Sequence, residues 1–151
     1  YALAYLIMNF TCFLVLSEVA QDGRDLKIAE FAGLYRRSPL LALALMAGLF
    51  SLAGVPPSIG FTGKLLVFTA AMSQGYFWLV LIGAVNGTIS LYYYLKVVYA
   101  AYFLEPGDLP HLSPSRAIRL TSCALILTIL IFGVFPNQFV ELARLAVKHI
   151  L

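Results

Sequence analysis

The chain has 151 residues, of which 62% are hydrophobic and only 11% are charged. This composition excludes an ordinary soluble domain and indicates an integral membrane protein. Ten Lys and Arg residues against seven Asp and Glu residues leave a net charge of +3. Because the basic residues are scattered, nucleic-acid binding has no support, and a lipid bilayer is the expected surrounding.

Charged residues divide the chain into four apolar stretches, of which the first covers residues 2–16. It is shorter than a full span of roughly 20 residues, and we therefore expect the sequence to be part of a longer polypeptide. A polar connector follows at residues 17–38. Within it, residues 26–35 (LKIAEFAGLY) are predicted to form a short amphipathic helix at the membrane interface.

The second stretch, residues 39–72, is too long for one straight span. Its 34 residues would measure roughly 50 Å at ~1.5 Å per residue, against a hydrocarbon core of ~30 Å. In its middle, Pro56 and Pro57 lack a backbone N–H, and their rings crowd the preceding helical turn. We therefore predict a discontinuous helix with half-helices at about 40–54 and 60–72.

Glycines loosen the backbone on both sides of this break. The residues that form the predicted break are Gly54, Pro56, Pro57, Gly60 and Gly63. Backbone groups without hydrogen-bond partners cannot face lipid, so the break must be buried in protein or lie beside water. Many transporters use such discontinuous helices to line ion paths, which makes the break a candidate functional site.

The third stretch, residues 76–104, has aromatic residues at both ends, as is typical of helices that end at the lipid headgroups. A loop with three prolines, residues 105–116, leads to the fourth stretch, residues 117–135. Residues 139–151 have charges at helical spacing and predict a C-terminal interfacial helix. The expected fold is an all-α membrane bundle of about four helices in one domain over residues 1–151. Its predicted spans are 2–16, 40–72 with the break, 76–104 and 117–135.

Basic residues near the helix ends predict the orientation of the chain. If the spans alternate, residues 17–38 and 105–116 lie on one side of the membrane. That side holds seven basic residues: Arg24, Lys27, Arg36, Arg37, Lys96, Arg116 and Arg119. The other side holds two, Arg144 and Lys148. The positive-inside rule then places the two loops in the cytoplasm or its organellar equivalent.

Lys64 lies within a turn of the predicted break and has apolar residues on both sides. A lysine at this depth costs roughly 2.5–3.5 kcal/mol on insertion scales. The nearest polar turn is about nine residues away, roughly 13 Å of helix, which exceeds the reach of a lysine, so we expect Lys64 to face inward. Desolvation disfavours the ammonium form, which makes Lys64 a candidate proton carrier. The alternative is a lysine held permanently by a carboxylate or by backbone carbonyls.

Four polar residues on the third stretch are candidates for a polar path: Asn86, Thr88, Ser90 and Tyr93. Bridging between neighbouring helices is the commonest role of such residues in membranes. The tyrosines at 92–94, followed by Lys96, are also typical of an aromatic belt with a snorkelling base. The sequence has no nucleophile with a general base, phosphate loop or metal-ligand cluster, so a proton path is favoured over covalent catalysis.

Three segments together resemble a known family. They are AEFAGLYRRSPLLALAL (29–45), SLAGVPPSIGFTGK (51–64) and ISLYYYLKVVYAAYF (89–103). The combination is similar to the C-terminal part of subunit N of respiratory complex I, called subunit 2 in mitochondria. This is an antiporter-like, proton-translocating part of NADH:quinone oxidoreductase. The resemblance covers residues 1–104 and extends more loosely to the end of the chain.

The resemblance implies a fragment of a fold with about fourteen transmembrane helices, in which Lys64 matches a lysine of the family's proton channel. It implies a proton-translocating, non-redox subunit with no cofactor in this chain; flavin, iron–sulfur clusters and quinone would belong to other subunits. The expected partners are other complex I membrane subunits, especially antiporter-like ones, and lipid. The expected location is a bacterial inner membrane or an organellar inner membrane. The alternatives are a subunit of a multisubunit cation/proton antiporter and a related membrane-bound hydrogenase-type complex.

Overall fold

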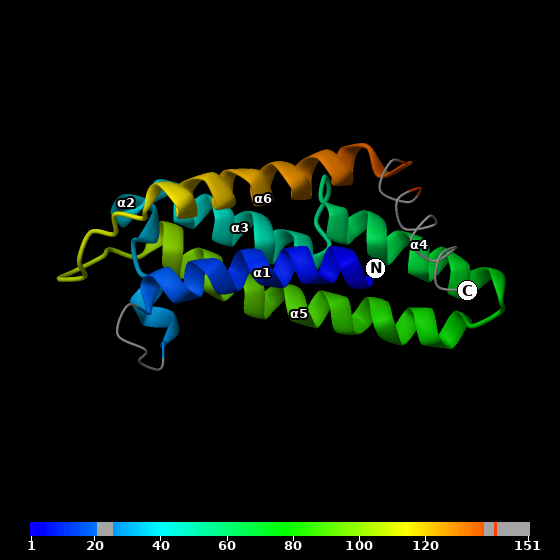
Figure 1. The fold of residues 1–151 in the computed structure, drawn as a ribbon. Helices are drawn as coiled ribbons and strands as arrows, with labels where there is room; N and C mark the ends of the chain where they lie inside the picture. Colours follow the sequence, from blue (N-terminus) through cyan, green and yellow to red (C-terminus); the bar gives the residue numbers. More distant parts are fainter. Residues whose placement is uncertain (21–25, 138–140, 142–151) are drawn as a thin grey trace.

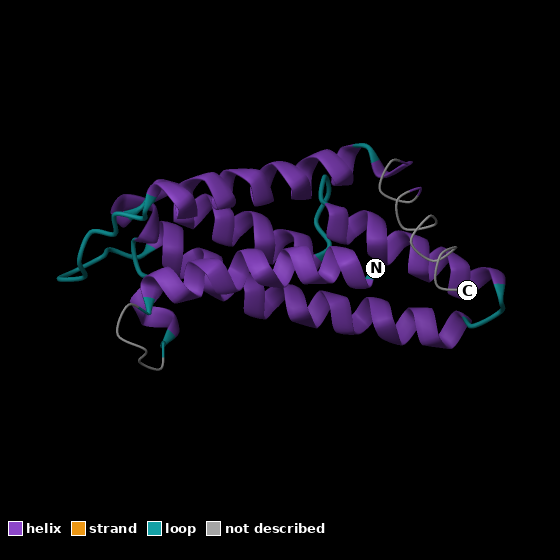
Figure 2. Ribbon diagram, viewed as in Figure 1, coloured by secondary structure: helices purple, strands orange, loops and turns teal. Residues whose placement is uncertain are grey.

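The computed structural model describes residues 1–20, 26–137 and 141, and all regular structure in this part of the chain is helical (Figure 2). The long helices are α1 (Ala2–Val19), α3 (Pro39–Ala53), α4 (Ile59–Ser73), α5 (Phe77–Phe103) and α6 (Arg116–Val134). Two short elements, the 3₁₀ helix η1 (Ile28–Phe31) and α2 (Leu34–Arg37), lie in the connector. The predicted C-terminal helix at 139–151 falls outside the described residues except for Glu141.

The predicted break is confirmed, because the second apolar stretch forms two 15-residue helices, α3 and α4, with an irregular segment between them. α3 begins with Pro39 in its first turn, where the missing N–H has no intrahelical role. It ends at Gly54, whose φ of +86° lies in the left-handed region that favours glycine. α4 begins after Ser58, whose hydroxyl accepts a hydrogen bond from Phe61 N–H.

The remaining long helices pack around the two half-helices (Figure 1). α3 is central, with contacts to α1, α5 and α6. α5 returns antiparallel alongside both half-helices after the tight turn at Gly75, and α6 lies over α3 and the break. α1 starts at the level of the break and runs along α3 toward the connector.

The connector and the loop after α5 meet at one end of the bundle, as the alternation of spans requires. Arg37 joins them, since its buried side chain donates to Pro110 O (2.8 Å) and Glu30 O (2.7 Å), and its own carbonyl accepts from Leu112 N–H (3.3 Å). Burial lowers the pKa of Arg37, and the nearby Glu30 carboxylate partly opposes this shift. The guanidinium nevertheless stays protonated, as arginine does in proteins.

The prediction of one amphipathic helix over residues 26–35 is wrong. The segment forms η1 and α2, separated at Gly33, whose φ is +59°. Gly33 N–H donates to Ala100 O of α5 (3.1 Å), and a Cβ at Gly33 would lie within 2.6–2.8 Å of Pro106. The docking of the connector onto α5 therefore interrupts the helix.

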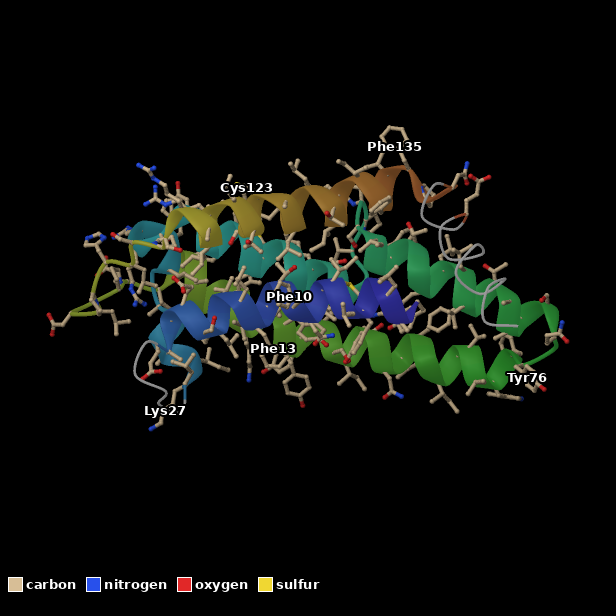
Figure 3. All side chains as sticks on the ribbon, in the orientation of Figure 1. Phe10, Phe13, Lys27, Tyr76, Cys123 and Phe135 are labelled. Atoms are coloured by element: carbon tan, nitrogen blue, oxygen red, sulfur yellow. The ribbon has the colours of Figure 1, made fainter. Side chains whose placement is uncertain are left out.

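The outward faces of the bundle are apolar, as a membrane requires. Phe135 is 61% exposed and points away from the bundle, and Phe13 is 63% exposed (Figure 3). Among the described residues, α1, α5 and α6 are each long and apolar enough to cross a bilayer, while α3 and α4 are shorter apolar helices. The buried core lies mainly between α1, α3, α5 and α6. A second, smaller cluster at the break joins Ala4, Met8, Ile59 and Ile129.

Candidate functional site

The C-terminal end of α3 leaves two carbonyl groups without a backbone donor. Gly54 N–H and Val55 N–H both donate to Phe50 O (3.0 and 2.9 Å), and Gly54 N–H also reaches Ser51 O (3.0 Å). This is the hydrogen-bond pattern of a Schellman motif around a left-handed glycine. The next two carbonyls, of Leu52 and Ala53, need donors from elsewhere because the last carbonyls of a helix have no intrahelical partner.

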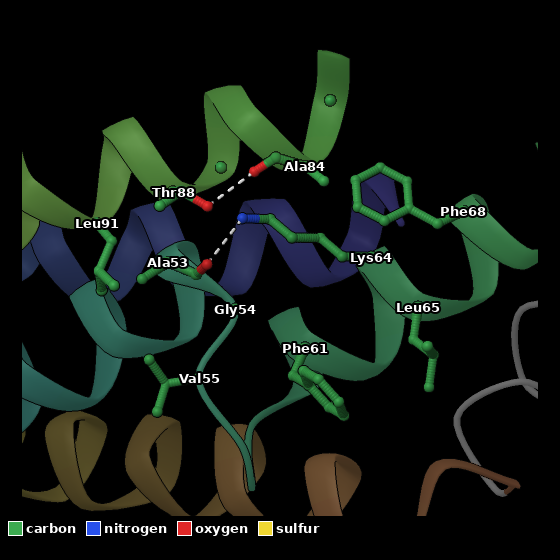
Figure 4. A pocket seen from close by; sticks show the side chains of 12 residues that line it. Ala53, Gly54, Val55, Phe61, Lys64, Leu65, Phe68, Ala84, Thr88 and Leu91 are labelled. Atoms are coloured by element: carbon green, nitrogen blue, oxygen red, sulfur yellow. Dashed lines mark hydrogen bonds between the residues drawn. The ribbon is translucent and has the colours of Figure 1, made fainter. Parts of the chain in front are cut away.

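Lys64 supplies those donors. Its Nζ donates to Leu52 O (2.8 Å) and to Ala53 O (3.0 Å), so a side chain from the second turn of α4 caps the end of α3 (Figure 4). The side chain is half-buried and faces inward, as the sequence predicted. A cation is favoured here because the C-terminal end of a helix carries partial negative charge.

Gly54 makes the approach of the lysine possible. A Cβ added at this position would lie 3.1 Å from Lys64 Cδ and 3.4 Å from its Nζ. The glycine therefore has two roles, since it adopts the left-handed backbone that ends α3 and leaves room for the side chain that caps it.

The N-terminal end of α4 is held against α3 and α1. Ser51 Oγ, which is fully buried, accepts from Gly60 N–H (3.0 Å) and donates to Met8 Sδ (2.9 Å). Ser58 Oγ, besides capping α4, donates to Val55 O (2.6 Å). A Cβ at Gly60 would overlap the carbonyl oxygen of Ser51, so only glycine allows this approach.

α6 and α1 cover other parts of the break. A Cβ at Gly133 of α6 would lie 2.5–2.7 Å from backbone atoms of Ser58 and Pro57, and Gly63 packs against the ring of Tyr1. The two prolines themselves, Pro56 and Pro57, are exposed in this chain. Of the predicted break residues, the three glycines therefore lie at close contacts, whereas the two prolines are exposed.

Two cavities meet at Lys64. The first, about 290 Å³, lies between the break, α4 and α5, and its lining includes Gly54, Phe61 and Thr88 (Figure 4). The second, about 360 Å³, lies between α1, α4 and α5. Four residues line both cavities: Lys64, Phe68, Gly83 and Gly87. Among the described lining residues neither cavity contains an acidic side chain, so the lysine faces carbonyl dipoles and hydroxyl or amide groups there.

The four polar residues proposed for α5 separate in the structure. Thr88 lines the first cavity, and Asn86 and Ser90 line the second. The hydroxyls of Thr88 and Ser90 donate to carbonyls one turn earlier in α5, at 3.0 and 2.8 Å, which leaves their oxygens as acceptors. Tyr93 is 60% exposed and lines neither cavity.

Sequence reasoning missed two parts of this site. One is the pair of α3 carbonyls to which Lys64 donates. The sequence does contain a signal for them, because a helix that ends at a glycine and is followed by prolines leaves its last carbonyls without backbone donors. The other is Tyr94, which is half-buried and lines the second cavity with Tyr5 of α1. Nothing local distinguishes Tyr94 from its two tyrosine neighbours.

A helix interrupted at mid-bundle, capped by a lysine and flanked by cavities, places the chain in the class of helical membrane proteins with discontinuous helices. Residues 1–90 match the family model described as "NADH:quinone oxidoreductase/Mrp antiporter, TM". The chain belongs to this family.

Individual relatives agree with this assignment. The chain is 57% identical over 152 aligned residues to "NADH-quinone oxidoreductase subunit N 2" of Syntrophobacter fumaroxidans, with 100% of the chain and 32% of that protein covered. It is 37% identical over 163 residues to "NAD(P)H-quinone oxidoreductase subunit 2" of Nostoc sp., covering 99% and 31%. The chain therefore spans about a third of the length of the curated relatives that it matches.

A solved structure shares the fold. It is described as "Respiratory complex I from Thermus thermophilus with bound Aureothin". The match has a TM-score of 0.76 and 30% sequence identity, and it covers 88% of this chain and 31% of that one. The all-α membrane architecture expected from the sequence is confirmed.

Proposed function

We propose that this chain is part of a proton-translocating membrane subunit of an NADH:quinone oxidoreductase, and that Lys64 takes up and releases a proton in that subunit. The observation that carries the proposal is the placement of Lys64. Its ammonium group donates to two carbonyls at the end of α3 and lies beside two cavities whose mainly apolar linings include hydroxyl or amide groups. The relatives are named as subunits of quinone oxidoreductases, and we take such a complex as the place of this proton exchange.

The geometry suits a lysine that changes its protonation state. A carboxylate partner would hold the ammonium form with a full opposite charge, whereas the α3 carbonyls offer only partial charges. An ammonium has three N–H donors, and only two have partners among the described residues. The third is free to donate to water in a cavity. When the proton leaves, the neutral amine still has two N–H groups for the same carbonyls, so the cap of α3 survives deprotonation.

In this proposal the subunit carries no redox step. The electron carriers and the quinone belong to other subunits, and a change in the charge or position of groups near Lys64 would couple their chemistry to proton movement. The chain would contact other membrane subunits of the complex, including antiporter-like ones. It would lie in a bacterial inner membrane with residues 17–38 and 105–116 on the cytoplasmic side, in accordance with the positive-inside rule.

A cation/proton antiporter subunit is the second candidate, because the family description includes Mrp antiporters. Isolation of the assembled complex separates the two candidates. Copurification with NADH:quinone oxidoreductase activity supports the first, and copurification with antiporter subunits alone supports the second. A sodium gradient that forms without electron transfer would also favour the antiporter.

The substitution Lys64→Ala tests the role of the lysine in the assembled complex. Loss of a positioned proton carrier typically costs about 10²-fold or more in the rate of the step that it serves. We therefore expect fewer protons pumped per NADH oxidised, measured with a pH-sensitive dye in inverted membrane vesicles. Lys96→Ala is the matched control, since Lys96 is exposed and lies over the ring of Tyr92, 4.5 Å from its centroid. Full pumping in the Lys64→Ala variant would refute the assignment and favour a permanently fixed lysine.

A further inference from the structure

The cavity between α1, α4 and α5 extends well beyond Lys64 along α5. Its lining on this helix runs from Gly83 to Tyr94, which are 11 residues apart, or roughly 16 Å at ~1.5 Å per residue. Lys64 lies on its α4 wall, and Tyr94 lies toward the end of the bundle where α2 and the loop after α5 meet. The cavity therefore joins the lysine to a tyrosine that no sequence signal singled out.

We propose that this cavity holds a water chain and that Tyr94 is a proton-relay residue between Lys64 and that end of the bundle. The inference rests on the proposed function and deepens it, because it names the next group on the path of the proton. Tyr93, the tyrosine that the sequence suggested, is directed away from this path.

The size and lining of the cavity suit water. A water needs about 30 Å³ of space, so about twelve could occupy the 360 Å³ of this cavity. Asn86 and Ser90 provide polar partners on α5, and Tyr5 provides a hydroxyl on α1. Ser90 Oγ already donates to Asn86 O, so its oxygen can accept a hydrogen bond from water.

The three consecutive tyrosines of α5 differ in their surroundings. Tyr92 and Tyr93 are 58% and 60% exposed, and their rings contact each other edge to face at 5.6 Å. Tyr94 instead packs against the main core and lies within electrostatic range of Tyr5. Of these three tyrosines, Tyr94 is thus the one that lines the cavity shared with Lys64.

A tyrosine hydroxyl can relay a proton without becoming charged for long, because it is both a donor and an acceptor. In the proposed step an N–H bond of the Lys64 ammonium breaks and its proton joins a neighbouring water. That water passes a different proton along the chain to the Tyr94 oxygen, while the Tyr94 O–H proton leaves to the next water. Lys64 ends as a neutral amine, Tyr94 is unchanged, and one proton has moved; the reverse sequence reloads the lysine.

The experiment uses the assembled complex with Tyr94→Phe and, as the matched control, Tyr93→Phe. Each change removes one hydroxyl group from α5, but only Tyr94→Phe changes a residue that lines the cavity. We expect Tyr94→Phe to lose part of the proton yield per NADH in inverted vesicles and to show a larger solvent deuterium isotope effect on pumping. Tyr93→Phe should match the unmodified complex in both measurements, and a purely structural role of Tyr94 would not change the isotope effect.

A thiol-labelling measurement tests the water chain independently of pumping. In a background with Cys12 and Cys123 replaced by Ala, Ser90→Cys should react with a charged, membrane-impermeant methanethiosulfonate. Ile89→Cys should not react, because Ile89, the neighbour of Ser90 in the chain, is 51% exposed and lines neither cavity. An unreactive thiol at position 90 overturns the water chain.

The outcomes of these experiments separate the inference from the proposed function. If Lys64→Ala loses pumping while Tyr94→Phe pumps and responds to deuterium like the unmodified complex, the relay is overturned and the role of the lysine stands. If Lys64→Ala pumps fully, the proposed function fails whatever Tyr94 does. Loss of pumping in both variants, with a reactive thiol at position 90, supports the path from the lysine to the tyrosine.

Discussion

Gly60 offers the sharpest test of how the break is held together. A Cβ at this position would overlap the carbonyl oxygen of Ser51 and lie 2.7 Å from both Ser51 C and Met8 Sδ. The methionine sulfur ends a flexible side chain and can move, but the Ser51 backbone lies inside α3 and cannot. Gly60→Ala should therefore push the start of α4 away from α3 and weaken the 3.0 Å hydrogen bond from Gly60 N–H to Ser51 Oγ.

The expected cost is the sum of two effects. Forcing extra atoms into a packed contact typically costs about 1–3 kcal/mol, and the weakened hydrogen bond adds about 1 kcal/mol. We therefore expect Gly60→Ala to lower the free energy of unfolding by roughly 2–4 kcal/mol. The measurement is the loss of helical circular dichroism when the detergent-solubilised protein is titrated with a denaturing detergent.

Gly87 provides the control, because it lies inside α5 and an added Cβ meets nothing within 4 Å. Gly87→Ala should raise the free energy of unfolding by about 0.5–1 kcal/mol, since alanine favours a helix interior over glycine by this amount. Equal changes in the two variants, or a Gly60→Ala protein as stable as the unmodified one, would refute the close-contact reasoning.

Two further predictions concern other contacts. Gly54→Ala and Gly75→Ala should each cost about 1–2 kcal/mol, because both glycines have left-handed φ angles of +86° and +82°. Only Gly54→Ala should also reduce proton pumping, since a Cβ there crowds Lys64 while one at Gly75 meets nothing within 4 Å; equal pumping would contradict this. Arg37→Ala should lower the free energy of unfolding by about 3–5 kcal/mol, because two hydrogen bonds from a buried cation are lost. The exposed Arg36→Ala should change it by less than about 0.5 kcal/mol, and since arginine stays charged, denaturant titrations at several pH values near neutrality should give the same difference.

The break was predictable from the sequence because its causes are local. Two adjacent prolines stop a helix wherever they stand, and the length of the apolar stretch excludes a straight span. The inward direction of Lys64 followed from the cost of exposing a lysine to lipid. These arguments needed no knowledge of neighbouring helices, and they placed the ends of α3 and α4 within one residue of the observed bounds.

The details of the site depended on packing between distant segments. Which tyrosine of α5 faces the cavity is set by the rotation of α5 against α3 and α1, and a helix that is apolar all round gives no amphipathic signal of that rotation. The split of residues 26–35 at Gly33 likewise depends on Ala100, about 70 residues away in the chain. Close contacts at Gly60 and Gly133 are visible only once α1, α3 and α6 are assembled.

The lysine and the break each make the other energetically acceptable. A lysine at this depth costs roughly 2.5–3.5 kcal/mol, and two carbonyls without donors at the end of α3 would cost about 1–3 kcal/mol each. One side chain lowers both costs, because the Lys64 ammonium donates to Leu52 O and Ala53 O at the negative end of α3. A leucine at position 64 would leave the carbonyls unpaired, and a continuous helix would leave the lysine without acceptors. Among the described residues, the charge is therefore stabilised by carbonyl dipoles and not by a carboxylate. A proton held in this way leaves more easily than one held by a full opposite charge, which is what the proposed proton transfer requires.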